Sequence, residues 1–212
     1  MASRVGLAGL VVALAYVLGA SDAQPAGTPA VYVVRADPRL CPSPLCGGYV
    51  VALANSARTR CADGRRRPRC YVAIAVANDG SPLGTIPNGS LTRGVLDAGR
   101  DDLGGLRVSA LYPPAGSANA RGAFYRVRDT GLRCVRAPCF SYSAARANGA
   151  ARSRVSGVDL APAKATAGEV ARAQAALDTA GLFATGRFVR GHAGGRTFRA
   201  TRIYLRVPLP RA

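Results

Sequence analysis

Two short cysteine clasps most constrain what this chain folds into. The chain reads RLCPSPLCGGYVVALAN from Arg39 to Asn55 and LRCVRAPCFSYSAARAN from Leu132 to Asn148. An alignment of residues 30–57 on residues 123–150 needs no gap, and a Y-x-V-R…C-x4-C-x2-Y-x5-N skeleton recurs in it. A repeated skeleton of this kind predicts two copies of one structural unit, at residues 31–112 and 123–212, joined by the Pro/Gly-rich segment 113–122. The sequence leaves open whether the two units share one compact core.

The predicted fold class is α+β, with two related β-β-β-α-β units, predominantly antiparallel sheet and one helix per unit. Apolar and β-branched runs predict strands at residues 30–36, 49–54, 71–77 and 105–112, and then at 123–129, 140–148 and 155–161. A helix is expected near residues 90–98. A second helix is expected after Thr166 and Glu169, which form a T-x-x-E capping box, with Gly181 as its stop. A final hairpin is expected around the glycine-rich GHAGG at residues 191–195.

The first 23 residues have the pattern of a secretory signal peptide. One arginine precedes an apolar run at residues 5–18, and Ser21 and Ala23 occupy the −3 and −1 positions of a cleavage site. The run is shorter than the roughly 20 residues that span a bilayer. We therefore expect cleavage after Ala23, with Ala20 as second choice, a short linker at residues 24–30, and a secreted or periplasmic mature chain without a transmembrane segment.

All six cysteines follow this segment, and an even set in an exported chain predicts disulfides. Spacing favours three local bridges, Cys41–Cys46, Cys61–Cys70 and Cys134–Cys139. The alternative is a four-cysteine zinc site built from the two C-x4-C pairs, although such sites more often use C-x2-C. A redox role would also call for closer spacing. The prediction is therefore disulfides, with no metal and no cofactor.

Arginine dominates the charge of the chain, which carries a formal net charge of +18. Such a charge attracts polyanions, which at an exported address would be anionic envelope polymers, lipid headgroups or extracellular nucleic acid; no feature indicates a specific nucleic acid. Two groups of residues are candidates for this binding. One surrounds the Cys61–Cys70 hairpin and the other lies on the last strand, where the alternative is a solvated face opposite a core of Ile203, Leu205 and Val207. The candidates are Arg58, Arg60, Arg65, Arg66, Arg67, Arg69, Arg202, Tyr204 and Arg206.

Catalysis has little support in the sequence. The single histidine, His192, lies in a Gly-rich turn, and Asp101, Asp102 and Asp159 lie in or beside expected loops. There is no G-x-S-x-G elbow, phosphate-binding glycine loop or EF-hand loop. We therefore expect a non-enzymatic binding or envelope-associated protein with a basic surface, and no catalytic residue is assigned.

The runner-up function is a secreted protease inhibitor, in which the proline-bearing loop of the first clasp would be a rigid segment offered to an active site. The different residues of the second clasp, VRAP, count against it. A hydrolase is the third reading.

The stretches YVVRADPRLCPSPLCGGYVV, TRCADG, FYRVRDTGLRCVRAPCFSY, SGVDL and IYLRV together carry a family resemblance. The chain resembles, over residues 31–207, a family of exported bacterial proteins classed as a domain of unknown function. The resemblance implies export and a bacterial source, and it transfers no activity and no site residues.

Overall fold

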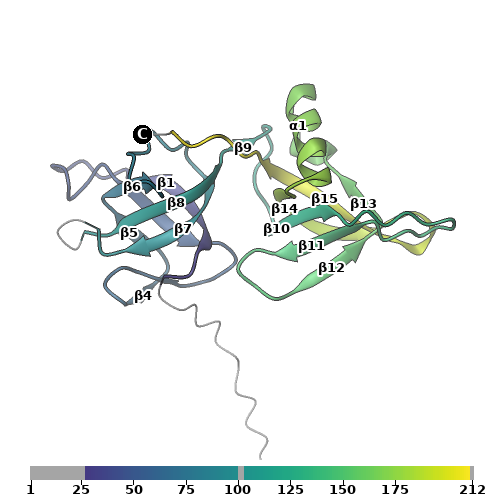
Figure 1. Ribbon diagram of the computed structural model, residues 1–212, viewed down its shortest axis with the longest axis horizontal. Coiled ribbons are helices and arrows are strands. Elements are labelled where there is room, and N and C mark those ends of the chain that lie inside the picture. Colours follow the sequence, from purple (N-terminus) through teal and green to yellow (C-terminus); the bar gives the residue numbers. More distant parts are fainter. Residues whose placement is uncertain (1–26, 100–102, 211–212) are drawn as a thin grey trace, which may run out of the picture.

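The computed structural model describes residues 27–99 and 103–210. The protein is mostly β, with two antiparallel-rich sheets side by side in an elongated molecule and one α-helix among the described residues (Figure 1). The predicted signal peptide at residues 1–23 lies outside the described residues, as does the pair Asp101–Asp102.

The first sheet has the strand order β5-β2-β1-β7-β8-β6. All neighbours are antiparallel except β6 and β8, which are parallel. Its strands are β1 (Ala30–Ala36), β2 (Tyr49–Leu53), β5 (Cys70–Val72), β6 (Ile74–Ala77), β7 (Ser90–Asp97) and β8 (Gly105–Tyr112). A separate two-stranded hairpin, β3 (Thr59–Arg60) and β4 (Arg66–Arg67), lies between β2 and β5 in the chain.

The second sheet has the order β12-β11-β10-β14-β15-β13, again with one parallel pair, β13 and β15. Its strands are β10 (Ala123–Asp129), β11 (Tyr142–Arg146), β12 (Arg152–Val155), β13 (Gly157–Asp159), β14 (Leu182–Arg190) and β15 (Arg196–Tyr204), and β9 (Pro114–Ala115) adds to β15. The 3-10 turn η2 (Ala161–Ala163) follows β13, and the 3-10 turn η3 (His192–Gly194) connects β14 to β15.

Each sheet curls until its two edge strands meet. In the first sheet the edge strands β5 and β6 are separated only by Ala73, and in the second only Ser156 separates β12 from β13. A sheet whose edges are joined by one residue must bend round on itself, which leaves few unpaired strand edges. The predicted single strands at 71–77 and 155–161 are therefore wrong as continuous elements, because each is divided between opposite edges of a curled sheet.

Two hydrophobic cores fill the sheets, and a third cluster joins them. Val34, Val51 and Leu106 are fully buried in the first core, and Val127 and Phe198 are fully buried in the second. The third cluster brings side chains of both sheets together, and its buried members are Val31, Ala54, Leu91, Ala147, Phe183 and Tyr204.

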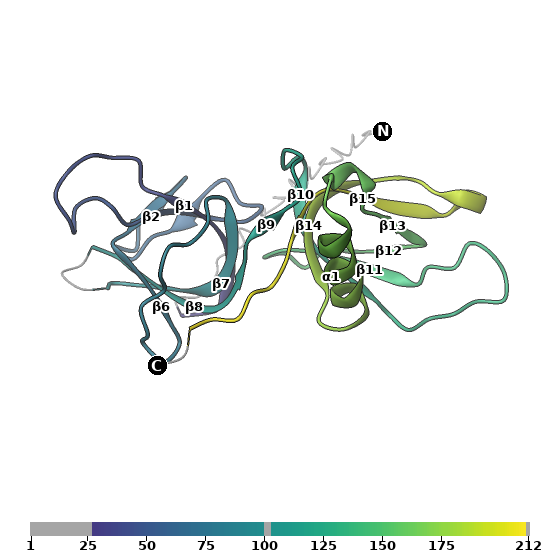
Figure 2. The ribbon, with the colours of Figure 1, turned by 90° about the horizontal axis from the view of Figure 1, so that it is seen from above.

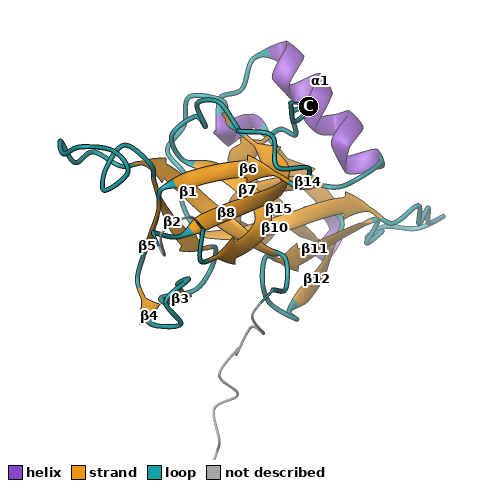
Figure 3. Cartoon of the chain, turned by 60° about the vertical axis from the view of Figure 1, so that its left-hand side comes forward, coloured by secondary structure: helices purple, strands orange, loops and turns teal. Residues whose placement is uncertain are grey.

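The helix α1 (Ala167–Asp178) begins directly after Thr166, as the capping box predicts, and it packs on the second core (Figure 3). Thr166 is its N-cap and accepts a hydrogen bond from Glu169 N, while the Glu169 carboxylate accepts one from Thr166 N at 2.8 Å. Ala173 and Leu177 pack into the second core. The helix therefore forms where the local signals are strongest.

The helix expected at residues 90–98 is wrong, and so is the β-β-β-α-β order with one helix per unit. These residues form β7, which pairs with both β1 and β8. Leu91 and Thr92 are buried in succession, and a side chain at Gly94 would come within 2.2 Å of the Arg107 carbonyl oxygen. The requirement for hydrogen bonds on both sides of a central strand outweighs the modest helical preference of this segment.

Candidate anion-binding surface

The basic hairpin, defined as residues 58–69, is held in one conformation by local contacts. The Cys61–Cys70 disulfide closes it, with 5.4 Å between the two Cα atoms. Cys61 N donates to Arg65 O at 2.8 Å, and Thr59, which is 1% exposed, accepts from Leu53 N through its hydroxyl at 2.8 Å. The hairpin is thus anchored to β2 at its base and stapled at its side.

Six arginines of the basic hairpin are all exposed, as expected from the sequence: Arg58, Arg60, Arg65, Arg66, Arg67 and Arg69. Arg67 forms an ion pair with Asp63 at 2.8 Å, and within residues 27–99 and 103–210 the other five form none. Arg60 pairs directly with Arg66 across the hairpin. Like charges directly opposite each other repel, so the hairpin keeps a concentrated positive charge at a cost to its own stability.

A groove beside the basic hairpin adds two more guanidinium groups, those of Arg35 and Arg146. This junction groove, of about 520 Å³, lies where the first sheet meets the start of β10, and Arg35, Arg69 and Arg146 line it together with the apolar side chains Val33, Val50 and Ala52. Val33 pairs with Ala52 and Arg35 with Val50 across β1 and β2, so these four side chains share one face of the sheet. Arg69 belongs to both the hairpin and the groove, which makes the two basic features continuous.

Arg35 and Arg146 were not predicted from the sequence as site residues. Arg35 is one of the residues repeated between the two aligned segments, matching Arg128, and that repetition was the only available signal. Arg146 comes from β11 of the second sheet. It reaches the groove only because the two sheets meet, which no local pattern predicts.

Reciprocal asparagine contacts position the junction groove. Asn55 Nδ2 donates to the carbonyl oxygens of Phe124 at 2.8 Å and Ala147 at 3.0 Å, and its Oδ1 accepts from Phe124 N at 2.8 Å. Asn148 does the same toward the first sheet, with Val31 O, Ala54 O and Val31 N at 2.7, 3.0 and 2.8 Å. Both asparagines have positive φ, 62° and 57°. The two sheets are therefore held together by six matched hydrogen bonds.

A second groove, of about 430 Å³, lies on the other side of these contacts and is lined by Arg93, Arg126, Arg146 and Asn148 among others. Here Arg126 already donates from Nε at 2.9 Å, and from Nη2, to the Ala180 carbonyl oxygen at the end of α1. One guanidinium of this groove is thus committed to the fold, which makes it a weaker anion site than the junction groove.

The predicted group on the last strand does not join the basic hairpin. Tyr204 is 3% exposed within the third cluster, and burial raises its pKa to about 12. Ile203 and Leu205 are also buried, because β15 is covered on both faces where the two sheets meet.

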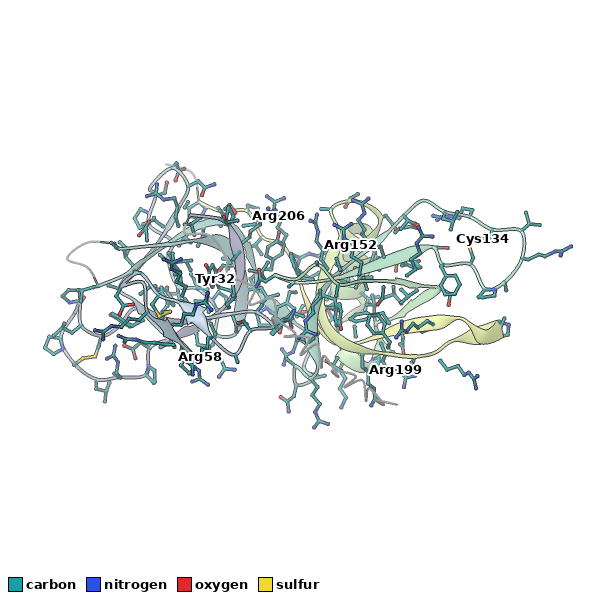
Figure 4. All side chains as sticks on the ribbon, turned by 90° about the horizontal axis from the view of Figure 1, so that it is seen from below. Tyr32, Arg58, Cys134, Arg152, Arg199 and Arg206 are labelled. Atoms are coloured by element: carbon teal, nitrogen blue, oxygen red, sulfur yellow. A yellow bond between two sulfur atoms is a disulfide. The ribbon has the colours of Figure 1, made fainter. Side chains whose placement is uncertain are left out.

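Arg202 Nη1 donates to Gly116 O at 3.0 Å. Arg206 is exposed, and Figure 4 shows it on the opposite side of the first sheet from Arg58. Tyr204 is therefore no stacking platform for a ligand.

The cysteines form the three predicted disulfides, Cys41–Cys46, Cys61–Cys70 and Cys134–Cys139. No described cysteine is free, so the four-cysteine zinc alternative is wrong. Among the described residues no group of three or more potential ligands could hold a metal ion. No helix in the described part of the chain is long and apolar enough to cross a membrane.

The other candidate side chains take ordinary structural roles. His192 is exposed in η3, and Asp159 binds Arg199 at 2.9 Å beside β15. Asp37 and Asp129 each lie next to a clasp and accept hydrogen bonds from Arg39 and Arg133, which hold the pKa of each carboxyl below its usual value. A carboxyl with a lowered pKa stays ionised near neutral pH, so Asp37 and Asp129 anchor the arginines of the two clasps.

A comparison with protein families matches residues 30–209 to a domain of unknown function, DUF6748. The chain belongs to this family. No curated protein and no solved structure matches the chain. The resemblance to an uncharacterised domain family is thereby confirmed, and membership of DUF6748 covers both sheets and both clasps without assigning an activity to either.

Proposed function

We propose that this DUF6748 protein is an exported, non-enzymatic module that binds an anionic polymer of the cell envelope through the basic hairpin and the junction groove. The observation that carries the proposal is the continuous surface of eight exposed arginines, six on the stapled hairpin and Arg35 and Arg146 in the groove, with Asp63 as the one carboxylate paired to them in the described residues. A surface with so little internal neutralisation attracts polyanions strongly.

Rigidity strengthens this binding. The Cys61–Cys70 disulfide and the buried Thr59 fix the hairpin before a ligand arrives. A pre-ordered site loses less conformational entropy on binding than a flexible arginine-rich tail does. The stapled hairpin therefore suits repeated contacts to phosphate or carboxylate groups along a chain.

Export accounts for the covalent framework. Three disulfides within one short chain are typical of oxidising compartments outside the cytosol. The apolar run at residues 5–18 and the small residues Ser21 and Ala23 supply a cleavable signal. We place the mature protein in the periplasm or outside the cell on these two grounds.

An internal duplication explains why the site lies at a junction. Both sheets have the same order of corresponding strands, and the pairing of Tyr32 with Leu53 is repeated 93 residues later by Tyr125 with Arg146. Asn55 and Asn148 make the same three contacts in opposite directions. A duplicated unit that pairs with its own copy creates grooves on both sides of the contact, and one copy gained the basic hairpin.

Charge reversal on the basic hairpin tests the proposal. The variant R60E/R65E/R66E keeps Arg67 with its partner Asp63 and is expected to weaken binding to inorganic polyphosphate roughly 100-fold, at about 1 kcal/mol per basic group facing an anionic surface. The matched control R152E/R154E/R190E changes the net charge equally at exposed positions of the second sheet. Equal weakening by both variants, or by neither, contradicts a hairpin site.

A further inference from the structure

Exposed apolar side chains are concentrated on the two clasps, defined as residues 39–46 and 132–139. Five large hydrophobic residues of the described chain are strongly exposed, and four of them lie on the clasps: Leu40 (102%), Leu45 (59%), Leu132 (45%) and Val135 (103%), the fifth being Ile74 (46%). Single exposed apolar residues scattered over a surface need no explanation. Two pairs gathered within or just before two disulfide-closed loops require an explanation.

The first clasp is rigid around its exposed leucine. The Arg39 guanidinium binds Asp37 at 2.9 Å, donates to Leu45 O at 3.0 Å and lies 4.7 Å from the centre of the Tyr71 ring. The Tyr71 hydroxyl donates to Pro44 O at 2.7 Å. Leu40 stands between this anchored arginine and the disulfide-bonded Cys41. Its backbone forms no hydrogen bond with any other described residue, so its N–H and C=O are free to pair with a partner.

The second clasp has a rigid stem of its own. The Asp129 carboxylate accepts hydrogen bonds from Arg133 at 2.8 Å and from Gly131 N at 2.7 Å. Thr130 donates from both its backbone N and its hydroxyl to Ser141 O across the base of the loop, each at 2.8 Å. Val135 lies just inside the Cys134–Cys139 bridge and forms no hydrogen bond with another described residue. Its side chain is fully exposed at the end of this anchored stem.

The two clasps project from opposite ends of the molecule. In Figure 2 the purple loop before β2 and the green loop between β10 and β11 extend away from the two sheets in opposite directions, and Figure 4 shows Cys134 out at one end. Neither clasp is covered by another element of the described chain, so two partner molecules have room to bind at once.

We propose that each clasp is a substrate-like loop that inserts its fully exposed aliphatic side chain into the apolar S1 pocket of a serine endopeptidase, which makes the chain a two-headed protease inhibitor. A protease cleft requires one protruding side chain for its specificity pocket and free backbone groups beside it, and Leu40 and Val135 meet both requirements. Fixing the loop in advance lowers the entropy lost on binding. This proposal is independent of the anionic-polymer site.

The difference in sequence between the clasps sets two specificities. Leu40 fits the deep hydrophobic slot of a chymotrypsin-like enzyme, and the smaller Val135 fits the shallow pocket of an elastase-like enzyme. The prolines of the two loops, Pro42 and Pro44 in the first and Pro138 in the second, further restrict the backbone. The VRAP sequence of the second clasp therefore gives the second head its own specificity.

Tight-binding titration of chymotrypsin, elastase and trypsin with the disulfide-intact protein tests the proposal. The expected result is stoichiometric inhibition of chymotrypsin and elastase. Leu40→Ala should weaken inhibition of chymotrypsin roughly 50-fold, as the loss of three buried carbon atoms implies, and leave elastase unaffected. Val135→Asp should do the reverse, because an unpaired charge enters an apolar pocket. Leu40→Arg should transfer the first head from chymotrypsin to trypsin, a gain that damage to the fold cannot produce.

Ile74→Ala is the control, because Ile74 is the one other strongly exposed large hydrophobic residue of the described chain (46%) and lies on β6, outside both clasps. It should leave both inhibition constants unchanged. Inhibition should also survive R60E/R65E/R66E, which separates it from binding of polyanions. The proposal is overturned if neither chymotrypsin nor elastase is inhibited at a tenfold molar excess of protein, if the clasps are cleaved as ordinary substrates, or if Ile74→Ala weakens inhibition as much as Leu40→Ala does.

Discussion

Replacing Asn55 by alanine should destabilise the protein strongly, although the side chain is polar and only partly buried. Asn55 forms three hydrogen bonds to the backbone of the second sheet, all between 2.8 and 3.0 Å. At about 1 kcal/mol net for each bond, their loss costs about 3 kcal/mol. Alanine at φ 62° adds about 1 kcal/mol, because its Cβ atom is strained in the left-handed region.

The expected loss is therefore about 4 kcal/mol, a large share of the roughly 5–15 kcal/mol that stabilises a typical domain. Urea unfolding of the disulfide-intact protein, followed by far-UV circular dichroism because the chain has no tryptophan, measures it. The midpoint of thermal unfolding should fall by about 8–16 °C. Asn148→Ala should match it, since Asn148 makes the same three contacts in the opposite direction.

Asn119→Ala is the control for this experiment. Asn119 is exposed and forms no side-chain hydrogen bond within the described residues, so its loss should change the free energy of unfolding by less than about 0.5 kcal/mol. A cost below about 1 kcal/mol for Asn55→Ala, or an equal cost for Asn119→Ala, refutes the reasoning that the asparagine pair joins the two sheets.

Three further predictions concern stability. Burial raises the pKa of Tyr204 to about 12, so its contribution to the free energy of unfolding is complete below the unfolded pKa of about 10 and is lost as the pH rises toward 12. The free energy of unfolding should therefore decline over that interval, and Tyr204→Phe should flatten the decline. Thr166→Ala should remove the N-cap of α1 at a cost of about 1 kcal/mol in urea unfolding, and an unchanged midpoint would contradict the capping role. Removing the Cys61–Cys70 bridge with C61A/C70A should cost about 2–3 kcal/mol of unfolding free energy, because the unfolded chain is no longer closed into a loop. Full reduction of the parent protein should add six hydrogens to its intact mass, two for each of the three disulfides.

Local signals predicted the elements whose structure depends on near neighbours. The strand β1 and the strand β8 begin and end where their apolar runs do, and the capping box at Thr166 and Glu169 marks the start of α1. The disulfides followed from spacing, because each bridge closes a short loop. These features need no knowledge of the rest of the chain.

Features that depend on closure of a sheet, or on contact between the sheets, could not be predicted from local sequence patterns. The break at Ala73 arises because the chain crosses between opposite edges of a curled sheet. Residues 90–98 become a strand because β1 and β8 lie on either side. Tyr204 is buried because the first sheet covers the face of β15 that alternation leaves exposed.

The residues of the candidate site also divide into those that local sequence predicts and those that only the contact between the sheets reveals. The arginines of the basic hairpin could be predicted, since they are close in sequence and lie within or just before a short disulfide loop. Arg146 could not, because it reaches the junction groove from the second sheet. Six of the eight arginines of this site could therefore be predicted from the sequence, whereas the place of Arg146 depends on how the sheets meet.

The salt dependence of binding tests the central claim, that the basic hairpin and the junction groove hold an anionic polymer, most directly. The affinity for inorganic polyphosphate should be measured from low to moderate salt, for the parent protein and for the neutral variant R60Q/R65Q/R66Q. Each contact between arginine and phosphate contributes roughly 0.7 to the slope of log affinity against log salt on a single-stranded polyanion. The account predicts a steep slope for the parent protein and a slope shallower by about 2 for the variant. A parent affinity that does not change with salt, or identical slopes for the two proteins, would contradict it.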